Sequence, residues 1–368
     1  MEHTSIKNKS KRDTNLDFLR ILSMIMVLLL HYFGKGQLLE SKNVDEISYI
    51  IFYILESLAI VAVNCYVFIS GYYLVKSEFK IRKFLKLWGE VVFYSTTIYI
   101  VMMMLGIEKF NITNTIKSCF PIITNQYWFI TSYLAMYLLF PFLNKLIYAI
   151  TEKEYRKLIL IILLLFSVPS LFPSKWLLDK TGGYGIIWFV CLYLIIGYVR
   201  LYVSDDLINK YKNKYLLIYF LCGIIIATTM LLIQCVSNKV NIKINPEKLL
   251  LYNTPLVLIE SLALFLYIKT INIKKENINK IILTIAPLTF SVYIIHEHPM
   301  IRAVLYKDIL HTEICYHNPF AILIIITSIL ILFTVCITIE YAREKIVSLI
   351  NKKIKYRKLT FTFRKDKK

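Results

Sequence analysis

The sequence predicts an all-α integral membrane protein, a polytopic bundle of about ten transmembrane helices with both termini in the cytoplasm. Of its 368 residues, 57% are hydrophobic, and the mean hydropathy is +0.60. A single soluble core cannot bury that much apolar surface. The apolar residues also fall in runs of about 20, the length of one bilayer crossing. Lys and Arg gather between the runs, as expected of loops that set topology.

The apolar runs place the expected spans and divide the chain. We predict spans near 16–34, 47–75, 86–106, 128–150, 157–173, 184–203, 215–236, 249–270, 281–300 and 319–350. Pro141 and Pro287 should kink their helices at the preceding turn. Residues 1–350 then form one transmembrane domain, and 351–368 a basic cytoplasmic tail. We interpret the tail as an anchor attracted to anionic lipid, with a nucleotide- or lipid-binding element as the alternative.

The formal net charge of +20 indicates topology and not nucleic-acid binding. The basic residues form short clusters in alternate loops, beginning with Lys7, Lys9, Lys11 and Arg12, so both termini should be cytoplasmic. We therefore expect membrane lipid, and no nucleic acid, as a partner. The first apolar run is too long for a signal peptide and has no cleavage site after it, so it should remain in the protein.

The cysteine pattern gives no metal or redox motif. No two of the seven cysteines form a CxxC pair, so we expect no metal site. Five fall in or at the ends of apolar spans, whereas Cys119 and Cys315 fall in predicted outer loops. A disulfide between these two is an open alternative.

The first span, Asn15 to Phe33, contains three ionisable residues. Arg20 and His31 are eleven residues apart, which at ~100° per residue places them on one face of a helix, ~16 Å apart along its axis. Charged groups in hydrocarbon cost about 2.5–3.5 kcal/mol each, so this face should line an internal cavity. We expect one stripe of this helix to be polar from end to end. Asp17 should pair with Arg20 across one turn.

Residue counting brings a second histidine to the depth of the first. The first and ninth spans both run outward, and His31 and His296 each lie ~24 Å along them. Tyr127 and Trp128 begin the fourth span at the same outer level. Their rings are either a sugar platform or ordinary residues of the interfacial belt, and both interpretations stay open. We expect His298 to be a solvated interfacial residue.

A second polar layer is expected near the cytoplasmic side. The second span brings Ser70 to roughly the depth of Arg20, and Gly71 beside it allows a close helix approach or a break. Three basic residues follow in the next loop: Arg82, Lys83 and Lys86.

Several stretches resemble the acyltransferase 3 family of membrane proteins, which O-acylate sugars and related acceptors. The LDFLR motif with its arginine-x10-histidine spacing resembles the first helix of that family. YWFITSYLAMYLLFPFLN is similar to its signature at the fourth helix, with Trp128 and Tyr133 on recurrent positions. TFSVYIIHEHPMIR resembles its late SxYxxxxH segment, with His296 on the matching histidine.

The SGYYL and KSEFKIRKFLK segments resemble the family's second helix and first cytoplasmic loop. Lys83 and Lys86 stand where the family often has arginine. The resemblance implies that Arg20 and His31 are needed for activity.

Together these observations predict transfer of an acyl group, most simply acetyl, from cytoplasmic acyl-CoA to a hydroxyl of a cell-surface glycan or glycolipid. Guanidinium and ammonium groups bind phosphate, and a neutral imidazole can deprotonate an alcohol. The expected catalytic residues are His31, Arg20 and His296. The expected residues for acyl-CoA are Arg20, Arg82, Lys83, Lys86 and Ser70, and those for the acceptor are Tyr127, Trp128, Tyr133 and Glu297.

Two other functions remain open. Many transporters also have ten helices with buried charge, although no internal repeat or matched pair of broken helices is found. A non-catalytic scaffold would leave the insertion cost of Arg20 and His31 unexplained. Four glutamates within predicted spans are interpreted as proton-relay or packing residues: Glu56, Glu90, Glu260 and Glu340. The Lys-, Ile- and Asn-rich composition favours a bacterial plasma membrane.

Overall fold

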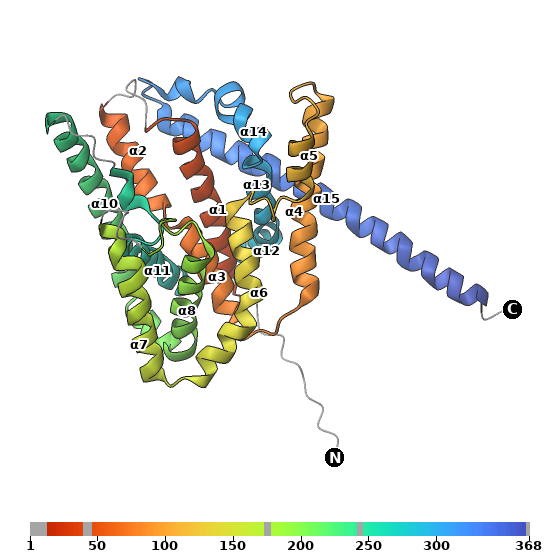
Figure 1. Cartoon of the computed structure of the whole chain (residues 1–368), viewed down its shortest axis with the longest axis horizontal. Coiled ribbons are helices and arrows are strands. Elements are labelled where there is room, and N and C mark those ends of the chain that lie inside the picture. The colour runs from red at the N-terminus through yellow and green to blue at the C-terminus, as the bar shows by residue number, and fades with distance from the viewer. Residues whose placement is uncertain (1–12, 40–45, 173–177, 241–245, 366–368) are drawn as a thin grey trace, which may run out of the picture.

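The computed structural model is a bundle of helices (Figure 1). It describes residues 13–39, 46–172, 178–240 and 246–365, and these contain no strand. The predicted all-α polytopic fold is confirmed. The basic residues before Asp13 and the side chains of the tail, residues 351–368, lie outside the described part, so the predictions made for them are not tested.

The described chain forms fifteen α-helices joined by loops and short helical turns of other types. The α-helices of the first half are α1 (Thr14–Lys35), α2 (Glu46–Ala59), α3 (Ala62–Leu74), α4 (Ile81–Met104), α5 (Ile112–Cys119), α6 (Trp128–Ala149) and α7 (Glu152–Ile162). Those of the second half are α8 (Ile186–Tyr202), α9 (Asp205–Lys210), α10 (Lys212–Val240), α11 (Pro255–Lys269), α12 (Glu276–Ile285), α13 (Thr289–His296), α14 (Pro299–Val304) and α15 (Ala321–Lys365).

Eight helical segments of the described residues are long and apolar enough to cross a membrane. They are Thr14–Lys35, Ile47–Leu74, Ile81–Met104, Trp128–Ala149, Lys212–Ser237, Pro246–Lys269, Glu276–His296 and Ala321–Ile350. These match eight of the ten predicted spans. A ninth, α8, is apolar but shorter, with 17 residues.

The predicted span near 157–173 differs most from expectation. The α-helix α7 ends at Ile162, and the chain continues as a π-helical turn, Leu163–Ser167, and a 3₁₀ turn, Val168–Leu171. Pro169 lies in the second turn and cannot donate a backbone hydrogen bond. Kinks were predicted at Pro141 and Pro287. The chain forms a 3₁₀ turn at Pro287, between α12 and α13, whereas α6 continues through Pro141.

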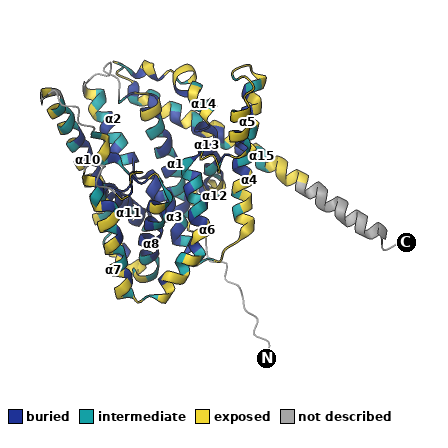
Figure 2. Ribbon diagram, in the orientation of Figure 1, coloured by how far each residue is buried: buried dark blue, intermediate teal, exposed yellow. Residues whose placement is uncertain are grey.

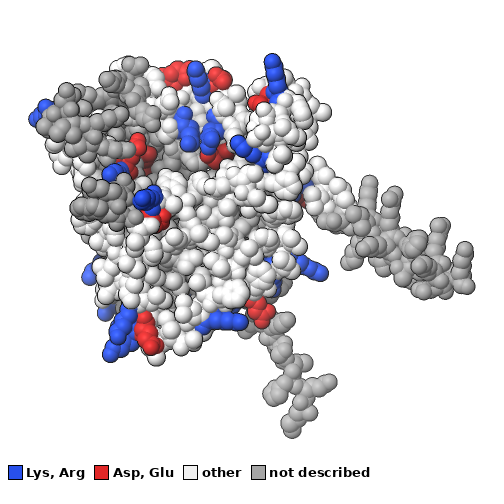
Figure 3. All heavy atoms as spheres, in the orientation of Figure 1, with Lys and Arg blue, Asp and Glu red and all other residues white. Residues whose placement is uncertain are grey.

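Helix α1 occupies the interior of the bundle. It packs against α2, α3, α11, α12, α13 and α15. Gly71 of α3 faces α8 closely, because a Cβ atom there would lie 2.6 Å from Ile196 Cγ2, which confirms the expected close helix approach. Buried residues concentrate in the middle of the bundle, and exposed residues cover α4, α7 and α10 (Figure 2). On the face shown in Figure 3, the charged side chains lie mostly toward the two ends, with a broad uncharged band between them.

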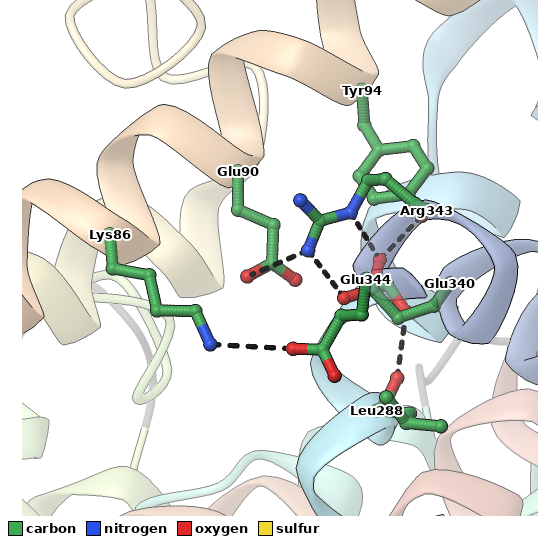
Figure 4. A network of polar contacts seen from close by, with 8 residues as sticks. Lys86, Glu90, Tyr94, Leu288, Glu340, Arg343 and Glu344 are labelled. Atoms are coloured by element: carbon green, nitrogen blue, oxygen red, sulfur yellow. Dashed lines mark hydrogen bonds and ion pairs between the residues drawn. The ribbon is translucent and has the colours of Figure 1, made fainter. Parts of the chain in front are cut away.

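A buried ionic network fastens α15 to α4 (Figure 4). Glu340 accepts hydrogen bonds from Arg343 Nε at 2.6 Å and from the Tyr94 hydroxyl at 2.6 Å. Arg343 also reaches Glu90, with 3.9 Å between Nη2 and Oε2. Glu90 and Glu340 are both buried. These two glutamates are therefore packing residues that share one arginine.

Candidate active site

Two histidines from opposite ends of the sequence meet inside the bundle. His31 lies in the last turns of α1, and His296 ends α13. His31 Nδ1 lies 2.8 Å from His296 Nε2, and the ring centroids are 5.1 Å apart. The structure therefore brings together the two imidazoles that residue counting placed at one depth.

The hydrogen bonds around His296 assign the proton positions of the pair. His296 Nδ1 lies 2.5 Å from the Val292 carbonyl oxygen, which can only accept, so Nδ1 carries the proton. In neutral His296 the Nε2 atom must then accept, and His31 Nδ1 donates to it. The lone pair of neutral His31 is consequently on Nε2, on the ring edge away from His296.

A carboxylate and a guanidinium extend the pair. Glu297 follows His296 directly, and its Oε2 lies 3.3 Å from His31 Nδ1. Its other oxygen forms an ion pair with Arg302 of α14. Glu297 is buried, and a buried carboxylate needs a partner of opposite charge. Arg302 is that partner. The sequence predicted that Glu297 binds the acceptor substrate, and the structure places its carboxylate beside His31 Nδ1.

His298 is not the solvated interfacial residue that was expected. It is 1% exposed, and its Nδ1 accepts a hydrogen bond from the Met300 amide at the start of α14. The chain turns at Pro299 into α14, and the His298 ring packs against Tyr127, with 6.4 Å between the ring centroids. Burial, together with the positive charge of Arg302, lowers the pKa of His298 to about 4.

The His31 ring forms part of the wall of a largely apolar cavity. The residues that line it are Met24, Val27, Leu30, His31, Val63, Tyr66, Trp128, Phe129, Tyr252, Phe290 and Tyr293. His31 is its only ionisable group besides the tyrosines. An apolar, largely aromatic wall around one imidazole is typical of a small-molecule site.

The predicted acceptor residues divide between this cavity and its surroundings. Trp128 lines the cavity, and Tyr133 stacks on Phe129, one of the lining residues, at 6.2 Å between centroids. Tyr127 is buried and lies 6.2 Å from Tyr293, so it is not an interfacial belt residue.

The stripe between Arg20 and His31 is not polar from end to end, as was expected. The residues between them on that face are Met24 and Val27, both buried and both part of the cavity wall. Arg20 itself pairs with Asp17, at 3.0 Å, which confirms the predicted pair. The cavity thus extends from His31 along α1 in the direction of Arg20 with apolar walls.

The basic residues that were predicted to lie in a loop lie instead on the first turns of α4, apart from the cavity. Arg82 and Lys83 are exposed, and Lys86 pairs with Glu344 of α15 at 3.4 Å between nitrogen and oxygen. Ser70 is half-buried on α3. The structure does not bring these four residues to His31.

Sequence reasoning missed two cations that lie close together around Tyr72. Arg200 of α8 donates to the Tyr72 hydroxyl at 2.6 Å, and Lys269 Nζ lies 5.3 Å from the centre of the same ring. The Lys269 carbonyl accepts a hydrogen bond from Asn15, so this group adjoins the start of α1. Arg200 and Lys269 end apolar helices, where a basic residue alone is a topology signal and gives no hint of such a cluster.

None of the four predicted intramembrane glutamates lines the cavity. Glu90 and Glu340 belong to the α4 to α15 network described above. Glu260 of α11 is fully buried against α10, where its Oε1 would lie 2.9 Å from a Cβ atom on Gly223. Glu56 is half-buried.

Three groups of the site could also hold a metal ion. The nearest ligand atoms of His31, His296 and Glu297 all lie within 4.8 Å of one another. Two imidazoles and a carboxylate suit several divalent metals. However, the two facing ring nitrogens already share a hydrogen bond, and Arg302 neutralises the carboxylate. This arrangement favours a proton relay over a metal centre.

The alternative disulfide is not formed. All seven cysteines fall within the described residues and all are free. Cys315 is buried, and its Sγ lies 3.7 Å from the Tyr32 hydroxyl instead of near Cys119.

The fold and the site define a polytopic, all-α membrane protein with a paired imidazole in an aromatic cavity. A family model described as an acyltransferase domain matches residues 13–340, nearly the whole chain. The chain therefore belongs to the acyltransferase 3 family and is a multi-pass membrane acyltransferase. No curated protein and no solved structure matched the chain.

Proposed function

We propose that this acyltransferase moves an acyl group, acetyl in the simplest case, from cytoplasmic acyl-CoA to a hydroxyl of a glycan or glycolipid. The observation that carries the proposal is the hydrogen bond between His31 and His296 at the wall of the cavity. It leaves His31 Nε2 with a free lone pair, as a general base requires.

The chemistry needs one proton carrier. His31 Nε2 takes the proton of the acceptor hydroxyl while the oxygen attacks the thioester carbon. A carbon-oxygen bond forms, the carbon-sulfur bond breaks, and the departing thiolate takes the proton back from the imidazolium. Glu297, at 3.3 Å, stabilises the transient positive charge on His31. General base catalysis of this kind typically contributes 10²- to 10⁴-fold.

The donor is proposed to enter from the end of α1 that contains Arg20. Arg20 offers a guanidinium to the nucleotide phosphates, and Arg82, Lys83, Lys86 and Ser70 stay candidates for the same role. Arg200 and Lys269 are stronger candidates than the cations at the start of α4, because they are held in place near the start of α1. The apolar wall of Met24 and Val27 offers contact surface to the methylene and methyl groups of the pantetheine arm.

The membrane placement forms part of the proposal. Both termini are proposed to be cytoplasmic, with residues 1–350 as the transmembrane domain and residues 351–368 as a basic tail on anionic lipid, in a bacterial plasma membrane. His31 then lies near the outer face, where surface glycans are.

A single-turnover assay tests the proposal. Purified protein with acetyl-CoA and a glycan acceptor should release free coenzyme A and acetylate the glycan, as seen by thiol titration and mass spectrometry. Movement of glycan across a vesicle membrane without thiol release would identify a transporter instead.

A further inference from the structure

Three aromatic rings from separate parts of the chain form one cluster at the cavity. Trp128 begins α6, Tyr252 precedes α11, and Tyr184 lies in the loop before α8. The ring centroids of Trp128 and Tyr184 are 4.6 Å apart, and those of Tyr184 and Tyr252 are 4.7 Å apart. Trp128 also stacks on Tyr252 at 5.8 Å with an interplanar angle of 21°. Trp128 and Tyr252 line the cavity of His31.

The loop that presents Tyr184 is built to lie on Tyr252. The Gly182 carbonyl accepts a hydrogen bond from the Tyr252 amide at 3.1 Å. Gly183 has a φ of +90°, and a Cβ atom there would lie 2.8 Å from Tyr252 Cβ. Only glycine tolerates both the angle and this contact. The position of the Tyr184 ring is therefore fixed by close backbone packing.

The geometry describes a platform and not a cage. Because the rings touch one another, no cation fits between them, as it would between the walls of an aromatic cage. Tyr184 is 44% exposed, whereas Tyr252 is 7% exposed and supports it from below. A surface of this kind offers negative π faces to a flat ligand with slightly positive C–H groups. The C–H face of a pyranose ring has this character.

We propose that Tyr184, Trp128 and Tyr252 form an acceptor subsite that stacks a pyranose ring and directs one of its hydroxyls toward His31. This inference rests on the proposed function, because it takes His31 as the base. It adds two aromatic residues, Tyr184 and Tyr252, to the acceptor site, and it names the C–H face of a pyranose ring as the part of the acceptor that they bind.

A glycan array tests the subsite without any acyl transfer. The full chain in detergent is applied to pyranose oligosaccharides and to matched open-chain polyols. Wild-type protein should retain the oligosaccharides at least tenfold better than the polyols, and Tyr184→Ala should lose most of that retention. Tyr184→Phe keeps the ring and should bind like wild type. Tyr341→Ala removes another exposed tyrosine, on α15, and should leave the pattern unchanged.

Every outcome bears on the subsite. Retention of no glycan, equal retention by Tyr184→Ala, or equal retention of the open-chain polyols would each overturn it. Release of coenzyme A is measured in parallel on the same preparations. Glycan retention that depends on Tyr184, without thiol release, would uphold the subsite and reject the proposed function. If Tyr184→Ala releases coenzyme A and acylates the glycan with an unchanged KM for the acceptor, the proposed function is upheld and the subsite is rejected.

Discussion

His31 and His296 stand 265 positions apart in the chain, yet their facing ring nitrogens are separated by 2.8 Å. The pair joins the first helix of the bundle to α13. Its hydrogen bonds leave one lone pair for chemistry, on His31 Nε2, and this single atom is where the proposed mechanism is most easily tested.

Replacing His31 by alanine should lower kcat for acyl transfer by about 10²- to 10⁴-fold, because the general base is lost. The fold should persist, since the ring borders a cavity. Transfer is measured by mass spectrometry of the glycan, and folding by size-exclusion chromatography in detergent. His317→Ala, at an exposed position, is the matched control. A normal rate in His31→Ala would mean that another group is the base.

Glu297→Gln should lower kcat about tenfold or more and leave KM for acyl-CoA nearly unchanged. The amide keeps the shape of the side chain but no longer stabilises a positive charge on His31. Glu297→Asp should recover part of the rate. Glu313→Gln replaces an exposed acid in the turn Thr312–Cys315 and controls for a general charge effect. A raised KM with an unchanged kcat would assign Glu297 to binding only.

Arg20→Ala should raise KM for acyl-CoA by about 10- to 100-fold, because a charged hydrogen bond to phosphate contributes roughly 1.5–3 kcal/mol. The same measurement on Arg200→Ala and Arg82→Ala compares a cation held by Tyr72 with an exposed cation at the start of α4. We expect a clear rise in KM for Arg200→Ala and a small one for Arg82→Ala. The opposite order would assign the phosphate site to the start of α4.

Arg343→Ala should destabilise the protein by about 3–5 kcal/mol, because it leaves Glu340 and Glu90 buried without their shared cation. Thermal unfolding in detergent measures the loss. Lys86→Ala breaks the neighbouring pair with Glu344, which is exposed, and should cost only about 0.2–1 kcal/mol. Equal losses in the two variants would contradict the network as a fastening of α15.

Stability should fall as the pH drops from about 6.5 to 4 because of His298. Its pKa is about 4 in the folded protein, below the ordinary 6.5, so the unfolded chain binds the proton first. This one group removes about 3 kcal/mol by pH 4. His298→Asn keeps a cap for α14 and should flatten that part of the profile. An unchanged slope in unfolding measured between pH 7 and pH 4 would show that His298 already titrates normally.

Much of the site could be predicted because depth in a membrane follows residue count. Counting brought His31 and His296 to one level, and the i to i+3 spacing gave the pair of Asp17 and Arg20. The burial of His298 could not be found in this way, because it depends on how the chain turns at Pro299. The same holds for Tyr184, whose contacts with Trp128 and Tyr252 depend on the backbone angles of the glycines that precede it.

The polarity of the α1 face between Arg20 and His31 was predicted wrongly for a different reason. A period of 3.6 residues places Arg20 and His31 on one face, and that face does line the site. That period does not reveal that the two residues between them, Met24 and Val27, make the face apolar. The lining of a cavity need not share the polarity of its two ends.

The length of α13 has a consequence for how this protein can change over evolution. The helix has eight residues and is bounded by prolines at 287 and 299. Inserting or deleting one residue would rotate the imidazole of His296 by about 100° and disconnect it from α1. Insertions and deletions should therefore be tolerated in the outer loops but should abolish activity between Pro287 and Pro299. The length of this interval should stay constant.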